Sequence, residues 1–200
     1  MKKIVIATKN KGKIREMKDA FNGFNVEVAA LDEFGELKEA VEDGETFEEN
    51  AKIKAAHYQK LTDTAVIADD SGLEVEILDN APGVYSARFA GGHESDAANN
   101  EKLIEEIKKR NATESPARYR CVLAFADVSG DMLLTDGACE GEIRLTPKGS
   151  GGFGYDPYFY IGEKSMAELT LEEKDKISHR GVALRKMVKL LEARGIIEAL

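Results

Sequence analysis

The sequence contains few of the residues on which secreted and membrane proteins depend. It has only two cysteines, Cys121 and Cys139, too few for a disulfide framework or a zinc site, so we expect both to be small buried apolar residues. The apolar run at the N-terminus, Ile4 to Ala7, is too short for a signal peptide. No stretch approaches the roughly 20 apolar residues that a membrane span requires. We therefore predict a soluble, cytoplasmic protein with no membrane association.

Positive charge is also in short supply. The 28 Lys and Arg residues are outnumbered by 37 Asp and Glu residues, which gives a net charge of −9. Because a polyanion would be repelled by this average field, we expect no general binding to nucleic acid. The balance does not exclude a small phosphorylated ligand, for which a few local lysines suffice.

The 200 residues are 42% hydrophobic, and no repeat or linker divides them. This is enough apolar material for one large domain or two small lobes that share a core. Hydrophobic periodicity predicts strands over 3–8, 64–68 and 73–77, and helices over 11–21, 47–61, 97–110 and 178–194. Alternation from residue 118 onward predicts antiparallel hairpins, with separate strands over 132–136 and 138–145. Together these patterns predict the α/β class, with a mixed sheet flanked by helices.

The turn after the first strand reads Thr8-Lys9-Asn10-Lys11-Gly12-Lys13. Backbone amides at the start of the following helix attract anions, and Lys13 in its first turn adds positive charge near a bound phosphate. Thr8 and Asn10 can donate hydrogen bonds or shape the turn. The segment is not a Walker A loop, and by itself it is also typical of an ordinary turn with surface lysines.

A capping box formed by Thr46 and Glu49 predicts where the second helix begins. Asn50 and Lys54 lie four residues apart on that helix, so their side chains stack on one face. That face either points into a cleft or is a solvated flank. Glu42 lies in the acidic loop before this helix and by itself indicates only a polar loop.

A stronger signal comes from Asp69 and Asp70, which follow the predicted strand 64–68. Open α/β sheets bind ligands at the carboxyl ends of such strands. Two adjacent carboxylates repel unless a cation joins them, and Mg²⁺ binds one or two carboxylates together with substrate phosphate oxygens. A carboxylate beside the metal can orient or deprotonate water. The alternative is that the two residues cap a turn.

The loop over residues 149–157 carries four glycines and two aromatic residues, Phe153 and Tyr155. Glycines let the backbone approach a ligand closely, and either ring can stack on a purine. Asp156 can accept a hydrogen bond from a base or sugar donor. The alternative is a plain glycine-rich loop.

Basic residues crowd the predicted start of the last helix, which Ser178 caps. Lys176, His179 and Arg180 lie near the positive end of a helix dipole, where cations are usually disfavoured. Their presence indicates an anion or a base carbonyl nearby. The chain shows no Ser-His-Asp order or Cys-His pairing, so we do not expect covalent catalysis.

Taken together, these segments resemble the inosine triphosphate pyrophosphatase family, whose members hydrolyse non-standard purine nucleoside triphosphates. The matching motifs run in the family's order: Thr8-x-Asn10-x-x-Lys13, Thr46-Phe47-x-Glu49-Asn50-Ala51-x-x-Lys54-Ala55, Ala68-Asp69-Asp70-Ser71-Gly72-Leu73, Pro82-Gly83-Val84-Tyr85-Ser86-Ala87-Arg88, Gly152-Phe153-Gly154-Tyr155-Asp156-Pro157 and Ser178-His179-Arg180. Each motif is weak by itself, but six in order over nearly the whole chain are very specific.

The resemblance implies one pyrophosphatase domain over residues 1–200, with an elongated mixed sheet, two lobes and a cleft between them. It also implies a homodimer. The implied reaction is Mg²⁺-dependent hydrolysis of ITP, dITP and XTP between the α- and β-phosphates, which gives a nucleoside monophosphate and pyrophosphate and cleanses the nucleotide pool.

The resemblance also implies roles for particular residues. The triphosphate would be held by Thr8, Asn10, Lys13 and Lys54. The metal would be bound by Glu42 and Asp70, and Asp70 would accept the proton of the attacking water. The nucleotide would be surrounded by Ser71, Phe153, Gly154, Tyr155, Asp156, Lys176, His179 and Arg180. Many relatives have two acidic residues before the Thr-Phe helix, but here Val41 precedes Glu42, so the metal role at that place rests on Glu42 alone.

For selectivity, our hypothesis is that donors near His179 and Arg180 meet the 6-keto oxygen of hypoxanthine or xanthine. Adenine has an amino group there, which would leave buried donors unpaired. Such a mismatch costs several kcal/mol, roughly 10⁴-fold in discrimination. The sequence does not rank ITP, XTP and dITP.

Two other functions fit part of the sequence. A haloacid-dehalogenase-type phosphatase would use Asp69 as its nucleophile, but that motif has a second Asp two residues later, where this chain has Ser71. A non-catalytic sensor of purine nucleotides would keep the lysines but needs no metal-side carboxylates, so the acidic residues count against it.

Overall fold

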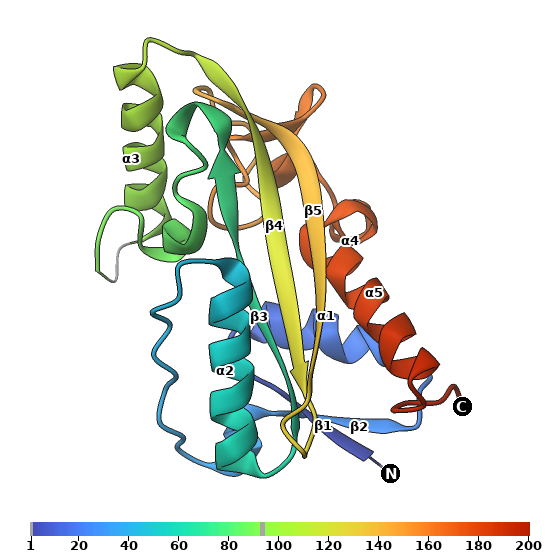
Figure 1. The fold of residues 1–200 in the computed structure, drawn as a ribbon. Coiled ribbons are helices and arrows are strands. Elements are labelled where there is room, and N and C mark those ends of the chain that lie inside the picture. The colour runs from blue at the N-terminus through green and yellow to red at the C-terminus, as the bar shows by residue number, and fades with distance from the viewer. Residues whose placement is uncertain (1, 93–94) are drawn as a thin grey trace. The chain divides into compact units, whose positions relative to one another are not determined.

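The computed structural model describes residues 2–92 and 95–200 (Figure 1). Its helices are α1 (Lys11–Ala20), α2 (Phe47–Thr62), α3 (Asp96–Lys109), α4 (Leu171–Ile177) and α5 (His179–Ala193). Its strands are β1 (Lys2–Ile6), β2 (Val26–Ala30), β3 (Ala65–Val75), β4 (Glu114–Ala126), β5 (Met132–Arg144), β6 (Phe159–Ile161) and β7 (Lys164–Ser165). Short 3₁₀ helices connect them: η1 (Leu31–Phe34), η2 (Glu76–Leu78), η3 (Gly83–Arg88) and η4 (Met166–Glu168).

The strands form one seven-stranded sheet in the order β2-β1-β3-β4-β5-β6-β7. β1 pairs in parallel with β2 and with β3. In contrast, β6 pairs antiparallel with β5 and with β7. The sheet is therefore mixed, and the predicted α/β class is confirmed.

The chain divides into two compact units. Unit 1 consists of the residues up to Asp70, then Cys121–Gly137 and Arg180–Leu200, and unit 2 consists of Ser71–Arg120 and Ala138–His179. Strands β3, β4 and β5 each contribute residues to both units. Two units agree with the two expected lobes, whereas the cleft and the single pyrophosphatase domain stay predictions.

The core of unit 1 lies where β1, β3 and β4 meet α1 and α5. Its buried side chains include Ile4, Met17, Ile67 and Leu123. The apolar residues of α5 recur at the spacing of one helix face, at Ala183, Leu184, Met187 and Leu191. Because Ile67 points into this core, the side chain two positions later in β3 points to the same side of the sheet.

Unit 2 has a core of its own, built from β3, α3, β4, β5 and β6. Its buried side chains include Leu73, Leu103, Tyr119, Ile143 and Phe159. The rings of Tyr119 and Phe159 pack with their centroids 4.5 Å apart. Each unit also buries one free cysteine, Cys121 in unit 1 and Cys139 in unit 2, as predicted.

The sequence analysis was wrong about where β3 ends. The predicted strands 64–68 and 73–77 are one strand, Ala65–Val75, so Asp69 and Asp70 lie inside a strand and not at its end. Asp69 is accommodated inside the strand because its carboxylate is paired with Lys13 and Arg180. The two strands predicted over 132–145 are likewise one strand, β5.

The helix predictions differ mainly at the C-terminal end. Thr46 caps α2 as predicted, because its Oγ1 accepts a hydrogen bond from the Glu49 amide at 3.1 Å. The predicted last helix begins at His179, directly after Ser178, which is also the C-cap of α4. Strands β2, β6 and β7 and helix α4 were not predicted.

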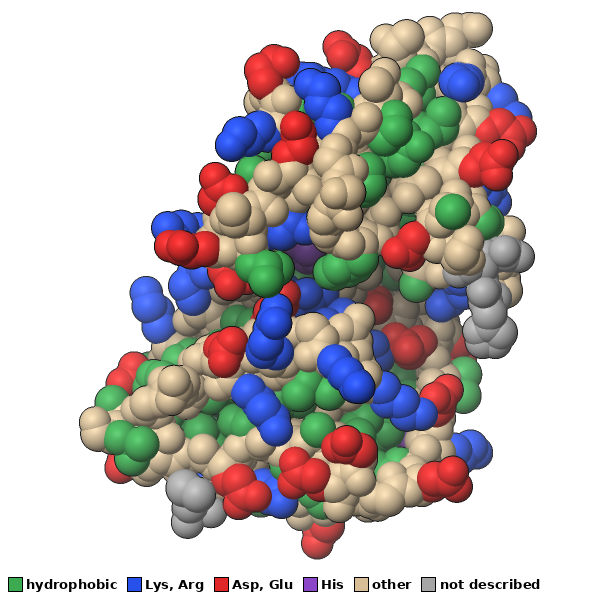
Figure 2. All heavy atoms as spheres, turned by 180° about the vertical axis from the view of Figure 1, so that it is seen from behind, with side chains coloured by type: hydrophobic (Ala, Val, Ile, Leu, Met, Phe, Trp, Pro, Cys, Tyr) green, Lys and Arg blue, Asp and Glu red, His purple; other side chains and the backbone are tan. Residues whose placement is uncertain are grey.

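Charged side chains of both signs lie interspersed on the face drawn in Figure 2. The expected absence of general nucleic-acid binding stays a prediction. In the part of the chain that the structure describes, no helix combines the length and the apolar character that crossing a membrane requires.

Candidate active site

The acidic pair Asp69-Asp70 lies in the middle of β3, where successive side chains face opposite sides of the sheet. Asp69 follows Ile67 by two residues and points to the side of α1 and α5. Asp70 points to the other side, where α2 supplies its partners. The two carboxylates therefore have different neighbours, and no cation between them is required to relieve repulsion within the pair.

Asp69 is a buried anion held by two cations. Its carboxyl Oδ2 accepts a hydrogen bond from Lys13 Nζ at 2.7 Å and lies 3.4 Å from Arg180 Nε, and the side chain is only 1% exposed. Burial by itself would raise the pKa of Asp69, but Lys13, Arg180 and then Lys54 outweigh burial and hold the pKa well below its usual range. The carboxylate is therefore ionised at any ordinary pH, and it fixes α1 and α5 against β3.

Arg180 contacts two carboxylates of unit 1. Besides Asp69, its Nη1 donates to Glu16 of α1 at 2.9 Å, and its side chain is buried. Burial by itself would lower the pKa of the Arg180 guanidinium, but the Asp69 carboxylate outweighs it and raises the pKa. These contacts favour a positioning role for Arg180.

Asp70 is a partly buried carboxyl group whose charge is poorly compensated. Burial raises the pKa of Asp70 to about 6, Lys54 acts to lower it, and the carboxylate of Glu42 raises it further. Its Oδ2 atom is buried and accepts no hydrogen bond from any described residue. A carboxylate with a raised pKa and an unsatisfied oxygen is suited to a proton or a cation.

Lys54 joins the acidic loop to β3. Its Nζ atom lies 2.7 Å from Glu42 Oε1 and donates to the Asp69 carbonyl oxygen at 2.8 Å. Burial by itself would lower the pKa of Lys54, but Asp69 and Glu42 outweigh it and raise the pKa. Unit 1 thus brings together four predicted site residues around the middle of β3: Lys13, Glu42, Lys54 and Asp70.

The donor set of Glu42 and Asp70 fits a hard divalent cation. The described residues contain no group of three or more His, Cys, Asp or Glu side chains placed to hold a metal. Two carboxylates are nevertheless what Mg²⁺ uses when substrate phosphates supply further oxygens. The unsatisfied Asp70 Oδ2 offers one such ligand atom.

The turn before α1 is shaped by its own side chains. Asn10 Oδ1 accepts hydrogen bonds from the Gly12 and Lys13 amides at 2.9 and 3.1 Å, and Thr8 Oγ1 accepts from the Asn10 amide at 3.2 Å. Of the two roles considered for Thr8 and Asn10, the structure thus shows the shaping of the turn. Their contact with a triphosphate stays a prediction.

In unit 2, Asp156 organises the glycine-rich loop. Its Oδ1 accepts from Tyr119 Oη at 3.1 Å, and its Oδ2 accepts from Lys174 Nζ at 2.7 Å and from the Phe153 amide at 3.2 Å. A Cβ at Gly152, which has a φ of +76°, would collide with this carboxylate and with Lys174. Both carboxylate oxygens of the buried Asp156 thus bind groups of the protein itself. This favours a positioning role over direct contact with a purine base.

The two aromatic residues of this loop have different surroundings. Tyr155 is buried and donates its hydroxyl to the Ser86 carbonyl oxygen at 2.6 Å, whereas Phe153 is 63% exposed. Gly154, between the two aromatic residues in the sequence, is held by two residues of α3. Asp96 accepts from the Gly154 amide at 2.8 Å, and Asn100 donates to the Gly154 carbonyl at 2.9 Å. Phe153 is therefore the ring that the structure leaves available for stacking.

The three remaining predicted residues of unit 2 have different surroundings. The His179 ring stacks on Tyr119 with the centroids 5.0 Å apart. Lys176 is exposed and lies 3.3 Å from Glu172, as expected of a helix flank. Ser71 follows Asp70 within β3.

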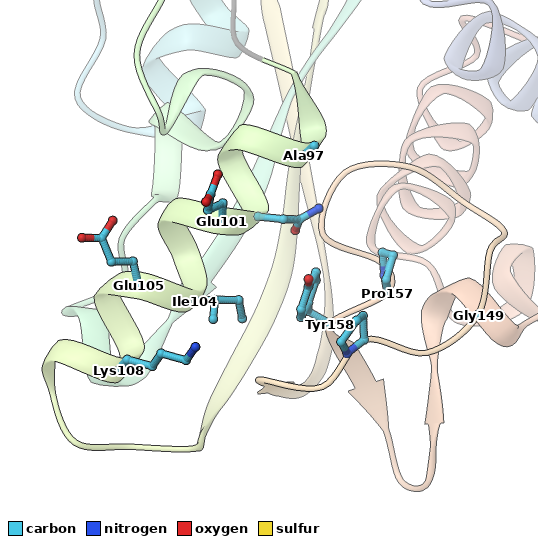
Figure 3. A pocket seen from close by; sticks show the side chains of 10 residues that line it. Ala97, Glu101, Ile104, Glu105, Lys108, Gly149, Pro157 and Tyr158 are labelled. Carbon is cyan, nitrogen blue, oxygen red and sulfur yellow. The ribbon is translucent and has the colours of Figure 1, made fainter.

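A hollow of about 710 Å³ lies between α3 and the segment 147–158 (Figure 3). Helix α3 supplies Ile104 and Lys108 to its lining, and the opposite side includes Pro157 and Tyr158. None of the predicted site residues lines this hollow. The candidate site is therefore defined by side-chain contacts and not by this cavity.

A model of the Ham1 family matches residues 4–190 of the chain. The chain belongs to the Ham1 family. A protein of Bacillus anthracis named dITP/XTP pyrophosphatase is 49% identical over 191 residues, which cover 94% of this chain and 95% of that protein. A protein of Desulfotalea psychrophila with the same name is 44% identical over 200 residues, which cover 96% of this chain and 89% of that one. The resemblance found in the sequence is thereby confirmed.

Solved Ham1 structures have the same fold as this Ham1-family chain. The HAM1 protein of Coxiella burnetii superimposes with a TM-score of 0.91 at 38% identity, over 96% of this chain and 100% of that one. The Ham1 protein of Staphylococcus aureus gives a TM-score of 0.88 at 40% identity, over the same shares of the two chains.

Sequence reasoning missed several residues of this Ham1-family site. Lys174 lies in α4, which periodicity did not predict, and Tyr119 was seen only as an alternating strand residue. Asp96 and Asn100 are four residues apart on α3, and this i,i+4 spacing of two polar residues was the one signal available.

Replacing Asp69 by Asn should destabilise the protein strongly, because the buried Arg180 then loses one of its anionic partners. We expect a loss of about 3–5 kcal/mol in the free energy of unfolding, measured by urea denaturation. The matched control is Glu27→Gln, which removes an exposed ion pair with Lys3 (3.0 Å) and should cost less than about 1 kcal/mol. Equal, small effects of both variants would contradict this account.

Replacing Asp70 by Asn should stabilise the metal-free protein at neutral pH. The folded pKa of about 6 exceeds the ordinary value of 3.8, so the stability that this carboxyl group confers in acid is lost as the pH rises from about 4 to about 6. Asn does not titrate. We therefore expect a gain of about 1–3 kcal/mol at pH 7 that disappears near pH 4, measured by urea denaturation in the presence of a chelator.

The control for this pH trend is Asp127→Asn. Hydrogen bonds from Ser129 hold the pKa of Asp127 below its ordinary value, so this substitution should destabilise the protein above that value and not stabilise it. An Asp70→Asn variant less stable than wild type at pH 7 would refute the conclusion that the ionised Asp70 carboxylate destabilises the folded protein.

Proposed function

We propose that this chain hydrolyses non-standard purine nucleoside triphosphates (ITP, dITP and XTP) between the α- and β-phosphates, giving a monophosphate and pyrophosphate. The observation that carries the proposal is the identity of 49% with a dITP/XTP pyrophosphatase over 94% of this chain. The partly buried group of Lys13, Lys54, Glu42 and Asp70 supports it, because these residues supply both charge neutralisation and a general base.

The triphosphate would bind to unit 1. Lys13 and Lys54 lie at the same place along β3, one at the Asp69 carboxylate and the other at the Asp69 carbonyl oxygen. Their ammonium groups would neutralise negative charge on the phosphate oxygens. Because Asp69 binds both lysine side chains, their positions are fixed before the substrate arrives. Phosphoryl transfer needs such positioning and charge stabilisation more than covalent help.

Glu42 and Asp70 would hold Mg²⁺, which supplies further neutralisation of phosphate charge when it is bound. The chain's own contribution to the chemistry is proton transfer. The oxygen of the attacking water forms the new bond to phosphorus, the α–β anhydride bond breaks, and the Asp70 carboxylate takes the proton of the water. A base with a pKa near 6 is suited to this task.

The purine base of the nucleotide would be recognised by residues of unit 2. Phe153 is exposed and can stack on a purine. Among the donors proposed for the 6-keto oxygen, Arg180 is engaged by Asp69 and Glu16, so the contact with the base falls to His179. Asp156, Tyr155 and Gly154 would hold the loop that carries Phe153, and Lys176 and Ser71 keep their proposed places around the nucleotide.

The homodimer is proposed from the family resemblance alone, and the cytoplasmic location from the sequence patterns described above. Sedimentation analysis of the purified protein would test the first. Neither affects the chemistry proposed for unit 1.

A panel of purine and pyrimidine triphosphates, assayed with Mg²⁺ and with both products identified, tests the function. We expect ITP, dITP and XTP to give monophosphate and pyrophosphate, with kcat/KM at least about 100-fold above that for ATP. Asp70→Asn should lower kcat by about 10²–10⁴-fold while nucleotide binding remains. Glu48→Gln removes an exposed carboxylate on α2, paired with Lys52, and should leave kcat unchanged.

Two outcomes would favour the alternative functions. Release of orthophosphate as the first product would revive the phosphatase. Tight binding of inosine triphosphate without turnover by the wild-type protein, with and without Mg²⁺, would favour the sensor.

A further inference from the structure

The loop that carries Glu42 has no regular structure of its own. Residues 35–46, between η1 and α2, contain neither helix nor strand, so their position depends on contacts with other elements. Loops of this length that lack secondary structure are usually functional. The question is what fixes Glu42 relative to Asp70.

Asn50 holds this loop by both backbone groups of a single residue. Its Oδ1 accepts a hydrogen bond from the Gly44 amide at 2.8 Å, and its Nδ2 donates to the Gly44 carbonyl oxygen at 3.3 Å. Asn50 is buried, only 2% exposed. Two hydrogen bonds from one planar amide fix both the position and the orientation of the loop residue.

The fit between the loop and α2 leaves no room for a side chain. A Cβ at Gly44 would lie 2.7 Å from Glu49 Cβ and 2.8 Å from Asn50 Oδ1. The glycine therefore permits the close approach on which the two hydrogen bonds depend.

Asn50 also reaches the other carboxylate of the pair. Its side chain lies close enough to the Asp70 carboxyl group to lower the pKa of that group. One side chain thus connects the loop of Glu42 with the strand of Asp70. Lys54, one turn further along α2, contacts Glu42 and β3 from the same helix.

The helix itself does not need Asn50 in order to begin. The first turn of α2 is already capped, because Thr46 accepts from the Glu49 amide at 3.1 Å and Glu49 accepts from the Thr46 amide at 3.3 Å. The side-chain hydrogen bonds of Asn50 are therefore directed to the loop and not to the helix terminus.

We propose that Asn50 is a positioning residue that sets the distance between the Glu42 and Asp70 carboxylates and thereby the affinity for a divalent cation. This inference rests on the proposed metal site and deepens it. Groups that orient metal ligands typically contribute 10–100-fold to metal affinity. Removing the Asn50 side chain frees the Gly44 backbone and with it the loop that carries Glu42.

Asn99 provides a matched control in unit 2. It is also a buried Asn on a helix, and it holds a loop in the same way: its Oδ1 accepts from the Ala90 amide at 2.8 Å and its Nδ2 donates to the Ala87 carbonyl at 3.1 Å. Asn50→Ala and Asn99→Ala therefore remove the same kind of side chain, and each removes two hydrogen bonds to the backbone of a loop. Only the former releases a loop that carries a proposed metal ligand, Glu42.

The experiment measures Mn²⁺ binding by electron paramagnetic resonance of the free ion, with and without a non-hydrolysable inosine triphosphate analogue. We expect Asn50→Ala to raise the Kd for Mn²⁺ about 10–100-fold and to shift the Mg²⁺ concentration needed for half-maximal hydrolysis by a similar factor. Asn99→Ala should leave the Kd within about 2-fold, whatever stability it loses. Unchanged Mn²⁺ binding in Asn50→Ala, or an equal loss in both variants, would overturn the proposal.

A second variant guards against misfolding of the first. Gly44→Ala keeps Asn50 but displaces the loop through its new Cβ, and it should weaken Mn²⁺ binding in the same direction. Gly44→Ala with wild-type affinity would overturn the proposal, even where Asn50→Ala fails to fold. If the wild-type protein binds Mn²⁺ but hydrolyses no triphosphate, the proposed function fails while the role of Asn50 is still tested by binding. If it binds no Mn²⁺ under either condition, the role of Asn50 fails, and the panel of triphosphates still tests hydrolysis.

Discussion

The alternation of side chains along β3 is the constraint on which the candidate site depends. Because Asp69 and Asp70 are neighbours in an extended strand, one must face α1 and α5 and the other must face α2. The strand gives two adjacent acids opposite environments, and from this follow their opposite pKa shifts and their different roles.

The two environments serve stability and chemistry separately. Asp69 is fully paired, and its charge is compensated by Lys13 and Arg180, so it stabilises the junction of three elements while it holds a lysine in place. Asp70 is partly buried without full compensation and accepts a cost to the folded state. Groups of the second kind are typical of functional sites, because the same unsatisfied charge that destabilises the protein is available to a substrate or a cation.

Polar side chains that look like ligands in the sequence serve in several cases to hold loops. Asp156 binds the backbone and side chains around its own loop, and Asn10 caps α1. Asn50 and Asn99 each hold one loop by its backbone. Loops without regular structure need such contacts because their own backbone groups have no partners in a helix or sheet. The residues that contact a ligand can then be few, provided that the loops carrying them are fixed.

The sequence by itself determined the family, the α/β class, the start of α2 and the residue types at the site, because capping boxes, hydrophobic periods and short motifs depend on neighbours along the chain. It placed Lys13, Glu42, Lys54 and Asp70 in one functional group, and unit 1 brings these four residues together. Only the tertiary structure decided the direction and the partners of each side chain. That β3 continues through its acidic residues, that Arg180 is bound by Asp69 and Glu16, and that Asn50 reaches both Gly44 and Asp70 depend on segments distant in sequence. A local pattern contains no information about such contacts, because the energy of a buried charge or amide is set by the groups that folding brings around it.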